Sequence, residues 1–206
     1  SDLPVLARKT YLNSGSYCAL ADSVRDAFNA YLDERLAAGA NWDLWITKSE
    51  AVRSAMAQVL RVTSDEIAVT ASASAGINAL ASALDFSGPR RNVVVSDFEF
   101  PTNAQIWHAQ ARRGAHVVHV PTAADGYIPL ENFARLIDDR TRLVAVTQVC
   151  FRNGARLDIA GIARLAHERG ALVMVDCYQA IGAMTVDAKA LGVDFAVGGR
   201  PKSLLG

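Results

Sequence analysis

The chain has 206 residues, of which 51% are apolar, enough to bury a core as one large domain or as a domain plus a small piece. Lysine plus arginine and aspartate plus glutamate both number 21, so neither nucleic acid nor an anionic membrane is an expected partner. No apolar run approaches the roughly 20 residues that cross a bilayer, and the first residues lack a signal sequence. We therefore expect a cytoplasmic protein.

The cysteines and histidines form neither a disulfide nor a metal pattern. Cys18, Cys150 and Cys177 are odd in number and far apart, so we expect reduced thiols. Cys150 and Cys177 end apolar segments, where a small buried hydrophobe is favoured over a nucleophile. No ligand spacing links the four histidines, which are His108, His116, His119 and His167. We therefore predict no metal site.

The apolar residues follow a helical period first and then alternate between strand and helix patterns. After an N-terminal arm, helices are expected over residues 21–38 and 45–60. Strands are expected over residues 67–70, 92–96, 116–120, 143–148, 172–176 and 195–197. Helices between them are expected over residues 75–84, 102–113, 130–137 and 158–169. This order predicts an α/β fold with a mostly parallel sheet and helices on both faces.

Ligands of such sheets bind outside the carboxyl ends of the strands, so the residues that follow each strand are the site candidates. After the first expected strand, small residues including Ala73 and Ser74 open a helix whose free amides favour an anion such as phosphate. The alternative is an ordinary serine-capped helix. After the second strand, Phe100 either stacks on a flat ring or is a core residue before a helix that starts with proline.

A carboxylate and a lysine follow the last two strands. Asp176 ends an apolar strand, where a carboxylate is costly to bury without a cation such as a protonated pyridine nitrogen. It could instead cap a helix. Lys202 is either a surface lysine or a desolvated amine with a lowered pKa that can form a Schiff base, and Gln179 either reaches a ring substituent or faces solvent. A buried acid that faces a lysine suggests pyridoxal phosphate.

Two rival phosphate motifs are not satisfied. A P-loop has glycine directly before its Lys-Ser pair, whereas this chain has Pro201 before Lys202 and Ser203. No G-x-G-x-x-G follows any expected strand, which disfavours a dinucleotide site.

The order of these features resembles the class V aminotransferase and cysteine desulfurase family of fold type I pyridoxal-phosphate enzymes. The most specific segments are residues 175–182, 191–195 and 198–206. The resemblance implies that residues 61–206 form the cofactor-binding large domain, incomplete at its C-terminus, after an N-terminal arm and helices in residues 1–60. Because the chain stops four residues after Lys202, we expect a fragment or half of a split enzyme, with the C-terminal part of the fold absent.

The resemblance also implies roles for the candidate residues. Lys202 would carry pyridoxal 5′-phosphate as a Schiff base, and Asp176 would keep the pyridine nitrogen protonated. Gln179 would bind the ring oxygen. Ala73 and Ser74 would bind the phosphate.

Further positions follow from the same resemblance. Phe100 would stack on the ring, where desulfurases usually have histidine and kynureninases phenylalanine. Asn153 or its neighbour Arg152 would point toward the cofactor, and Arg200 would contact the phosphate. Gly199 and Pro201 stand where many desulfurases have serine and histidine.

The implied function is that of a PLP-dependent lyase or transferase with a small amino-acid substrate. Desulfurase-like or carbon–sulfur lyase-type β-elimination through an external aldimine is favoured, and the alternatives are a class V aminotransferase and a kynureninase-like hydrolase. A nucleotide-binding oxidoreductase, or an inactive fragment or interaction module without cofactor, stays open. The resemblance implies a homodimer, with the N-terminal arm and residues 42–45 as candidate contacts.

Overall fold

A single parallel sheet organises the computed structural model, which describes residues 2–199 and 202–204. The described residues form a five-stranded sheet with the order β2-β1-β3-β4-β5, and all neighbouring strands are parallel. The strands are β1 (Asn92–Ser96), β2 (His116–Val120), β3 (Thr141–Thr147), β4 (Leu172–Asp176) and β5 (Phe195–Val197). The predicted α/β architecture is confirmed. The strand order reverses between β1 and β3, which is where sheets of this kind bind ligands.

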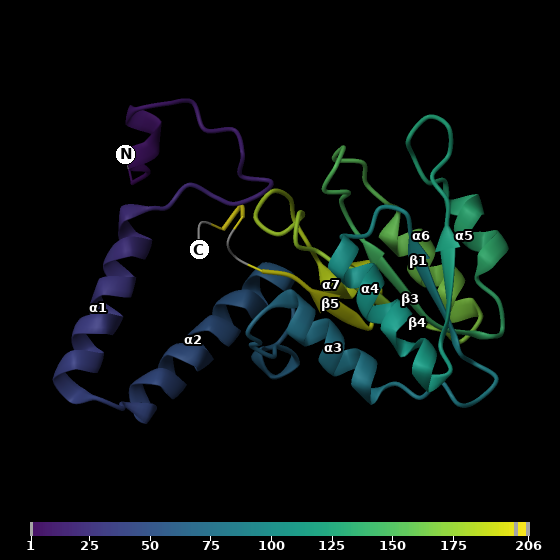
Figure 1. Cartoon of the computed structure of the whole chain (residues 1–206), viewed down its shortest axis with the longest axis horizontal. Coiled ribbons are helices and arrows are strands. Elements are labelled where there is room, and N and C mark those ends of the chain that lie inside the picture. The colour runs from purple at the N-terminus through teal and green to yellow at the C-terminus, as the bar shows by residue number, and fades with distance from the viewer. Residues whose placement is uncertain (1, 200–201, 205–206) are drawn as a thin grey trace.

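The helices connect these strands and extend the chain at its N-terminal side (Figure 1). The α-helices are α1 (Asp22–Ala38), α2 (Trp42–Leu60), α3 (Ala73–Ala83), α4 (Pro101–Ala109), α5 (Leu130–Leu136), α6 (Ile159–Glu168) and α7 (Ala188–Leu191). Short 3₁₀ helices are η1 (Pro4–Ala7), η2 (Ser64–Glu66) and η3 (Gln110–Arg113).

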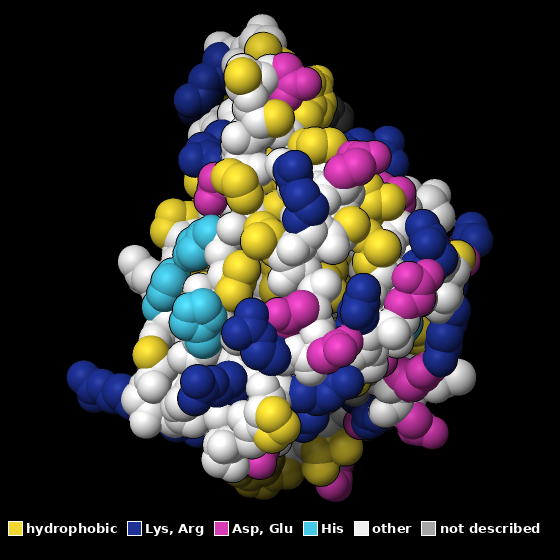
Figure 2. Space-filling model, turned by 90° about the vertical axis from the view of Figure 1, so that its right-hand side faces the viewer, with side chains coloured by type: hydrophobic (Ala, Val, Ile, Leu, Met, Phe, Trp, Pro, Cys, Tyr) yellow, Lys and Arg dark blue, Asp and Glu magenta, His cyan; other side chains and the backbone are white. Residues whose placement is uncertain are grey.

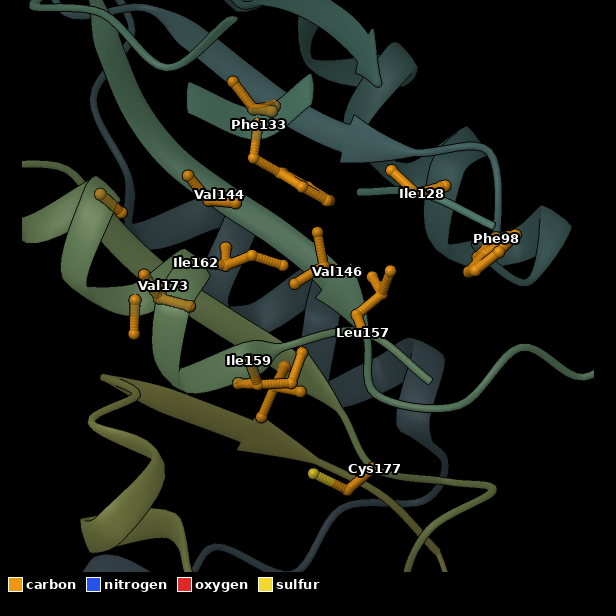
Figure 3. Close-up of a cluster of buried hydrophobic side chains, with 14 of the residues drawn as sticks. Phe98, Ile128, Phe133, Val144, Val146, Leu157, Ile159, Ile162, Val173 and Cys177 are labelled. Atoms are coloured by element: carbon orange, nitrogen blue, oxygen red, sulfur yellow. The ribbon is translucent and has the colours of Figure 1, made fainter. Parts of the chain in front are cut away.

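Each face of the sheet carries its own hydrophobic cluster. Trp107 of α4 lies in one cluster with Val95 of β1. Phe133 of α5 and Ile162 of α6 lie in the other cluster (Figure 3). This cluster also contains Val94, the neighbour of Val95. Successive residues of a strand point to opposite faces of the sheet, so an apolar strand such as β1 contributes side chains to both clusters. Burial of each large side chain contributes roughly 1.5–3 kcal/mol.

Local hydrogen bonds explain where the predicted elements differ from the observed ones. The strand predicted over residues 67–70 is wrong, because the Ile67 carbonyl accepts a hydrogen bond from Arg53 Nε at 2.9 Å and no described strand pairs there. Helix α2 begins three residues earlier than predicted because the Asn41 side chain accepts a hydrogen bond from the Leu44 amide. Asp187 caps α7 in the same way, and this short helix was missed.

The N-terminal helices are much less covered than the sheet. Helix α1 has no buried residue and stands away from the sheet in Figure 1. Helix α2 reaches the core only at its C-terminal end, through Ala57 and Leu60. The division of the chain at residue 60 stays a prediction.

The surface of the α/β region has mixed charge. Figure 2 shows basic and acidic side chains interspersed over one face, in keeping with the zero net charge of the sequence. Across the part of the chain that the structure describes, no helix combines the length and the apolar character needed to cross a membrane.

Candidate active site

A cavity of about 580 Å³ lies at the carboxyl edge of the sheet. Ends of β3 and β4, the start of α3 and residues of the N-terminal arm line it. The predicted site residues among its lining are Ala73, Ser74, Phe100, Asp176, Gln179 and Lys202. Asn153 is not among the lining residues, and Arg200 lies outside the described residues. Residues from widely separated parts of the sequence therefore meet in one cavity.

Asp176 is the buried acid of this cavity. It ends β4 and is 5% exposed. Its carboxylate accepts a hydrogen bond from the Tyr178 amide at 2.8 Å and another from Asn103 Nδ2. Burial raises the pKa of Asp176, although these hydrogen bonds and the charge of Lys202 act in the opposite direction. The carboxylate is therefore incompletely compensated and would gain from a cation in the cavity.

Asn103 is a site residue that sequence reasoning missed. It lies in the first turn of α4, is buried, and lines the cavity. The sequence feature that could have identified Asn103 is a polar side chain in the first turn of a helix that starts at the carboxyl edge of the sheet. Its partner Asp176 is 73 residues away, so only the tertiary structure shows the contact.

Lys202 supplies an amine to the cavity that Asp176 also lines. Its Nζ lies 5.0 Å from the centre of the Tyr178 ring. Burial lowers the pKa of Lys202, while the negative charge of Asp176 opposes this shift. A lowered pKa leaves more of the amine unprotonated, which a nucleophile or a base requires.

The N-terminus of α3 is the candidate anion site. The Ser72 hydroxyl accepts a hydrogen bond from the Ala75 amide at 3.1 Å, which confirms a serine cap. The half-buried residues Ala73 and Ser74 form the first turn beside the cavity. Their side chains are small, so an anion can approach the amides at the positive end of the helix. The capping and phosphate interpretations are thus compatible.

Gln179 holds part of the N-terminal arm against the site. Its Nε2 donates a hydrogen bond to the Gly15 carbonyl at 3.0 Å. Residues of the arm therefore line the cavity, among them Asn13 and Tyr17. Sequence reasoning had given the arm only a role in dimer contacts.

Phe100 and the loop after β3 form another part of the cavity. The Phe100 ring is 46% exposed and meets the Phe151 ring edge to face, with centres 5.2 Å apart. Asn153 shapes the turn, since its Oδ1 accepts a hydrogen bond from the Ala155 amide and its Nδ2 donates to the Gly126 carbonyl.

The cysteines next to the site are core residues. Cys150 and Cys177 are buried in the cluster under α5 and α6, as a small hydrophobe would be. Burial, with a further contribution from Asp176, raises the pKa of Cys177 to about 12. A thiol with so high a pKa is a poor nucleophile at neutral pH.

Sequence comparison identifies the family. The class V aminotransferase family matches residues 11–206, and the chain therefore belongs to it. YcbU of Bacillus subtilis, an uncharacterized aminotransferase, is 36% identical over 203 residues, which are 98% of this chain and 54% of that protein. A probable cysteine desulfurase of Methanothermobacter thermautotrophicus is 32% identical over 210 residues, with coverage of 100% and 52%. The chain spans about half the length of these curated relatives.

Structure comparison agrees on the fold. C-DES carrying glycine covalently linked to its PLP cofactor has a TM-score of 0.89 at 24% identity, and the match covers 100% of this chain and 56% of that chain. The cystine C–S lyase C-DES in complex with its product cysteine persulfide also gives 0.89 at 24% identity, with coverage of 99% and 56%. The predicted family and its α/β fold are thereby confirmed.

Proposed function

We propose that this chain binds pyridoxal 5′-phosphate and forms most of the active site of an enzyme that cleaves the carbon–sulfur bond of a sulfur-containing amino acid. The observation that carries the proposal is one cavity that joins the buried Asp176 carboxylate, the Lys202 amine and the N-terminus of α3. These three features match a cationic ring nitrogen, an aldehyde and a phosphate. The names of the desulfurase and C–S lyase relatives support the choice of substrate.

Each group of the chain has a defined task in this proposal. Asp176 would hold a proton on the ring nitrogen by pairing with the resulting cation, and the first turn of α3 would bind the phosphate. When bound, the cofactor supplies an electron sink for charge that develops at the substrate α-carbon. Lys202 would hold the cofactor and would also move a proton at the substrate α-carbon. Phe100 would pack on the ring, and Gln179 is the candidate partner of the ring oxygen.

Reductive trapping tests the cofactor and the lysine together. The purified chain is incubated with pyridoxal 5′-phosphate, treated with borohydride and weighed intact, with Lys202→Ala in parallel. Lys48→Ala, which removes an exposed lysine of α2, is the matched control. We expect one pyridoxyl adduct on the parent and on Lys48→Ala, and none on Lys202→Ala. Equal labelling of all three proteins would refute the assignment of Lys202, and no adduct on the parent would favour an inactive fragment or interaction module.

The reaction type is tested by its products. With cystine or cysteine as substrate, β-elimination releases pyruvate, ammonia and a sulfur product, whereas transamination converts the cofactor to its amine form. A kynureninase-like hydrolase is the second candidate because Phe100, and not histidine, lies at the mouth of the cavity. Hydrolysis of kynurenine without release of sulfur from cystine would favour that alternative.

We also propose a homodimer in the cytoplasm. Helix α1 exposes the large apolar side chains of Phe28, Tyr31, Leu32 and Leu36, and contiguous exposed apolar patches often mark interaction surfaces. The free cysteines are in keeping with a reducing compartment. Light scattering of the parent and of Phe28→Asp tests the assembly, and a monomeric parent would refute it.

A further inference from the structure

Glu99 is a buried carboxyl group that the proposed chemistry does not use. It follows β1 in the loop before α4 and is 8% exposed. Its Oε1 accepts a hydrogen bond from the Ser96 hydroxyl at 2.6 Å and another from the Thr147 amide at 2.8 Å. Ser96 ends β1 and Thr147 ends β3, so Glu99 joins these two strands where the strand order reverses.

Among the residues that the structure describes, the surroundings of Glu99 contain a second acid and no compensating cation. Thr147 is the register partner of Asp176, which places the two carboxyl groups at neighbouring strand ends. Among the described residues Glu99 has no ion pair, and Asp176 is the charged group that acts on it. Lys202 acts on Asp176 instead. Asp97 on the same loop accepts a hydrogen bond from the Thr122 amide and pairs with His119.

We propose that Glu99 is a positioning residue held in its neutral, protonated form, which clamps the ends of β1 and β3 and leaves Asp176 as the anion of the site. Two neighbouring buried carboxyl groups cannot both ionise at little cost, so one retains a proton. Asp176 has the amine of Lys202 nearby and, on the proposed function, a cationic ring. Glu99 has no cationic partner in the described part of the chain, so it is the group that keeps the proton.

Burial raises the pKa of both carboxyl groups in the free chain, and the charge of Lys202 opposes the increase only at Asp176. Burial raises the pKa of Glu99 to about 8, and the charge of Asp176 adds to the increase. The hydrogen bonds from Ser96 and Thr147 act in the opposite direction and do not cancel it. A neutral Glu99 adds no negative charge near Asp176, so of these two carboxyl groups only Asp176 would contribute negative charge at the ring nitrogen.

Infrared spectroscopy of the cofactor-free chain tests the protonation state directly. Exposed carboxyl groups are ionised at pH 7, so a protonated carboxyl stretch at that pH reports a buried acid. We expect this band in the parent and in Asp176→Asn, and its loss in Glu99→Gln. A band that disappears in Asp176→Asn and persists in Glu99→Gln would overturn the assignment, and so would a parent without the band.

Cofactor binding tests the positioning role. Glutamine has the shape and the acceptor oxygen of a neutral glutamate, so Glu99→Gln should bind pyridoxal 5′-phosphate within about threefold of the parent. Glu99→Leu keeps the volume but leaves the Ser96 and Thr147 donors unpaired, and we expect at least tenfold weaker binding. Weakening of tenfold or more in Glu99→Gln would refute a neutral Glu99. Because the infrared test needs no cofactor, failure of the proposed function would not be mistaken for failure of this inference.

Discussion

Replacement of Asp176 by asparagine should separate the stability of the chain from its affinity for the cofactor. The carboxylate accepts two hydrogen bonds, from Tyr178 and from Asn103, and bonds of this charged kind contribute about 1.5–3 kcal/mol each. Desolvation of the charge costs several kcal/mol. Because the pKa of Asp176 is raised, the cost of desolvating its charge exceeds the stabilisation that the hydrogen bonds and Lys202 give the charged form. The free chain therefore gains little from the negative charge.

The asparagine variant keeps the shape of the side chain and removes the charge. Its amide oxygen can still accept the Tyr178 bond, and rotation of the Asn103 amide restores the second one. We expect the free energy of unfolding to rise by up to about 1 kcal/mol or to stay within error. The cofactor, in contrast, loses its buried counter-ion, which costs roughly 3–5 kcal/mol. At 1.4 kcal/mol per factor of ten, binding should weaken at least 100-fold.

Two measurements on the same preparations check this prediction. Urea unfolding at pH 7 without cofactor gives the stability, and a spectroscopic titration with pyridoxal 5′-phosphate gives the affinity. Asp65→Asn, which alters a fully exposed carboxylate, should leave both quantities unchanged. If Asp176→Asn lost more than 2 kcal/mol of stability and kept its affinity within threefold, the carboxylate would be a structural group and not a cofactor ligand.

Four further changes test other parts of the structure. Ser72→Ala removes the cap of α3 and should cost about 1 kcal/mol in urea unfolding, while Ile162→Ala, at a site 1% exposed, should cost 2–5 kcal/mol. Gly114→Ala places a Cβ 2.8 Å from the Phe86 carbonyl oxygen, so it should lower the melting temperature more than Gly126→Ala, which shares a positive φ but meets no atom within 4 Å. From pH 4.5 to about 8 the folded chain keeps the Glu99 proton that the unfolded chain loses, so parent stability should fall by about 1.4 kcal/mol per pH unit from this group. Glu99→Gln should lack that part of the slope, and an unchanged slope would contradict the raised pKa.

Some residues of the site could be predicted because their sequence context is local. Asp176 ends a continuous apolar run, and Ala73 and Ser74 open a helix with small side chains, so the elements around them determine their positions. The parallel sheet then brings the strand ends to one edge. Lys202 follows from the same reasoning, because it comes soon after the last expected strand.

Other features depend on contacts between distant segments. The segment at residues 67–70 has the composition of a strand, yet the Arg53 side chain of α2 donates a hydrogen bond to the Ile67 carbonyl. The arm reaches the cavity through the Gln179 bond to Gly15, 164 residues away. No local pattern contains either partner.

The amino-acid sequence by itself determined the alternation of helices and buried strands, the family, and the acid and lysine of the site, because apolar periodicity and short motifs are local properties. The tertiary structure decided the strand order and the pairing of Asn103 with Asp176. It also decided that Glu99, an acidic residue between two phenylalanines, turns inward. Its burial and its neighbours exist only after β1, β3 and β4 have come together, and they raise its pKa.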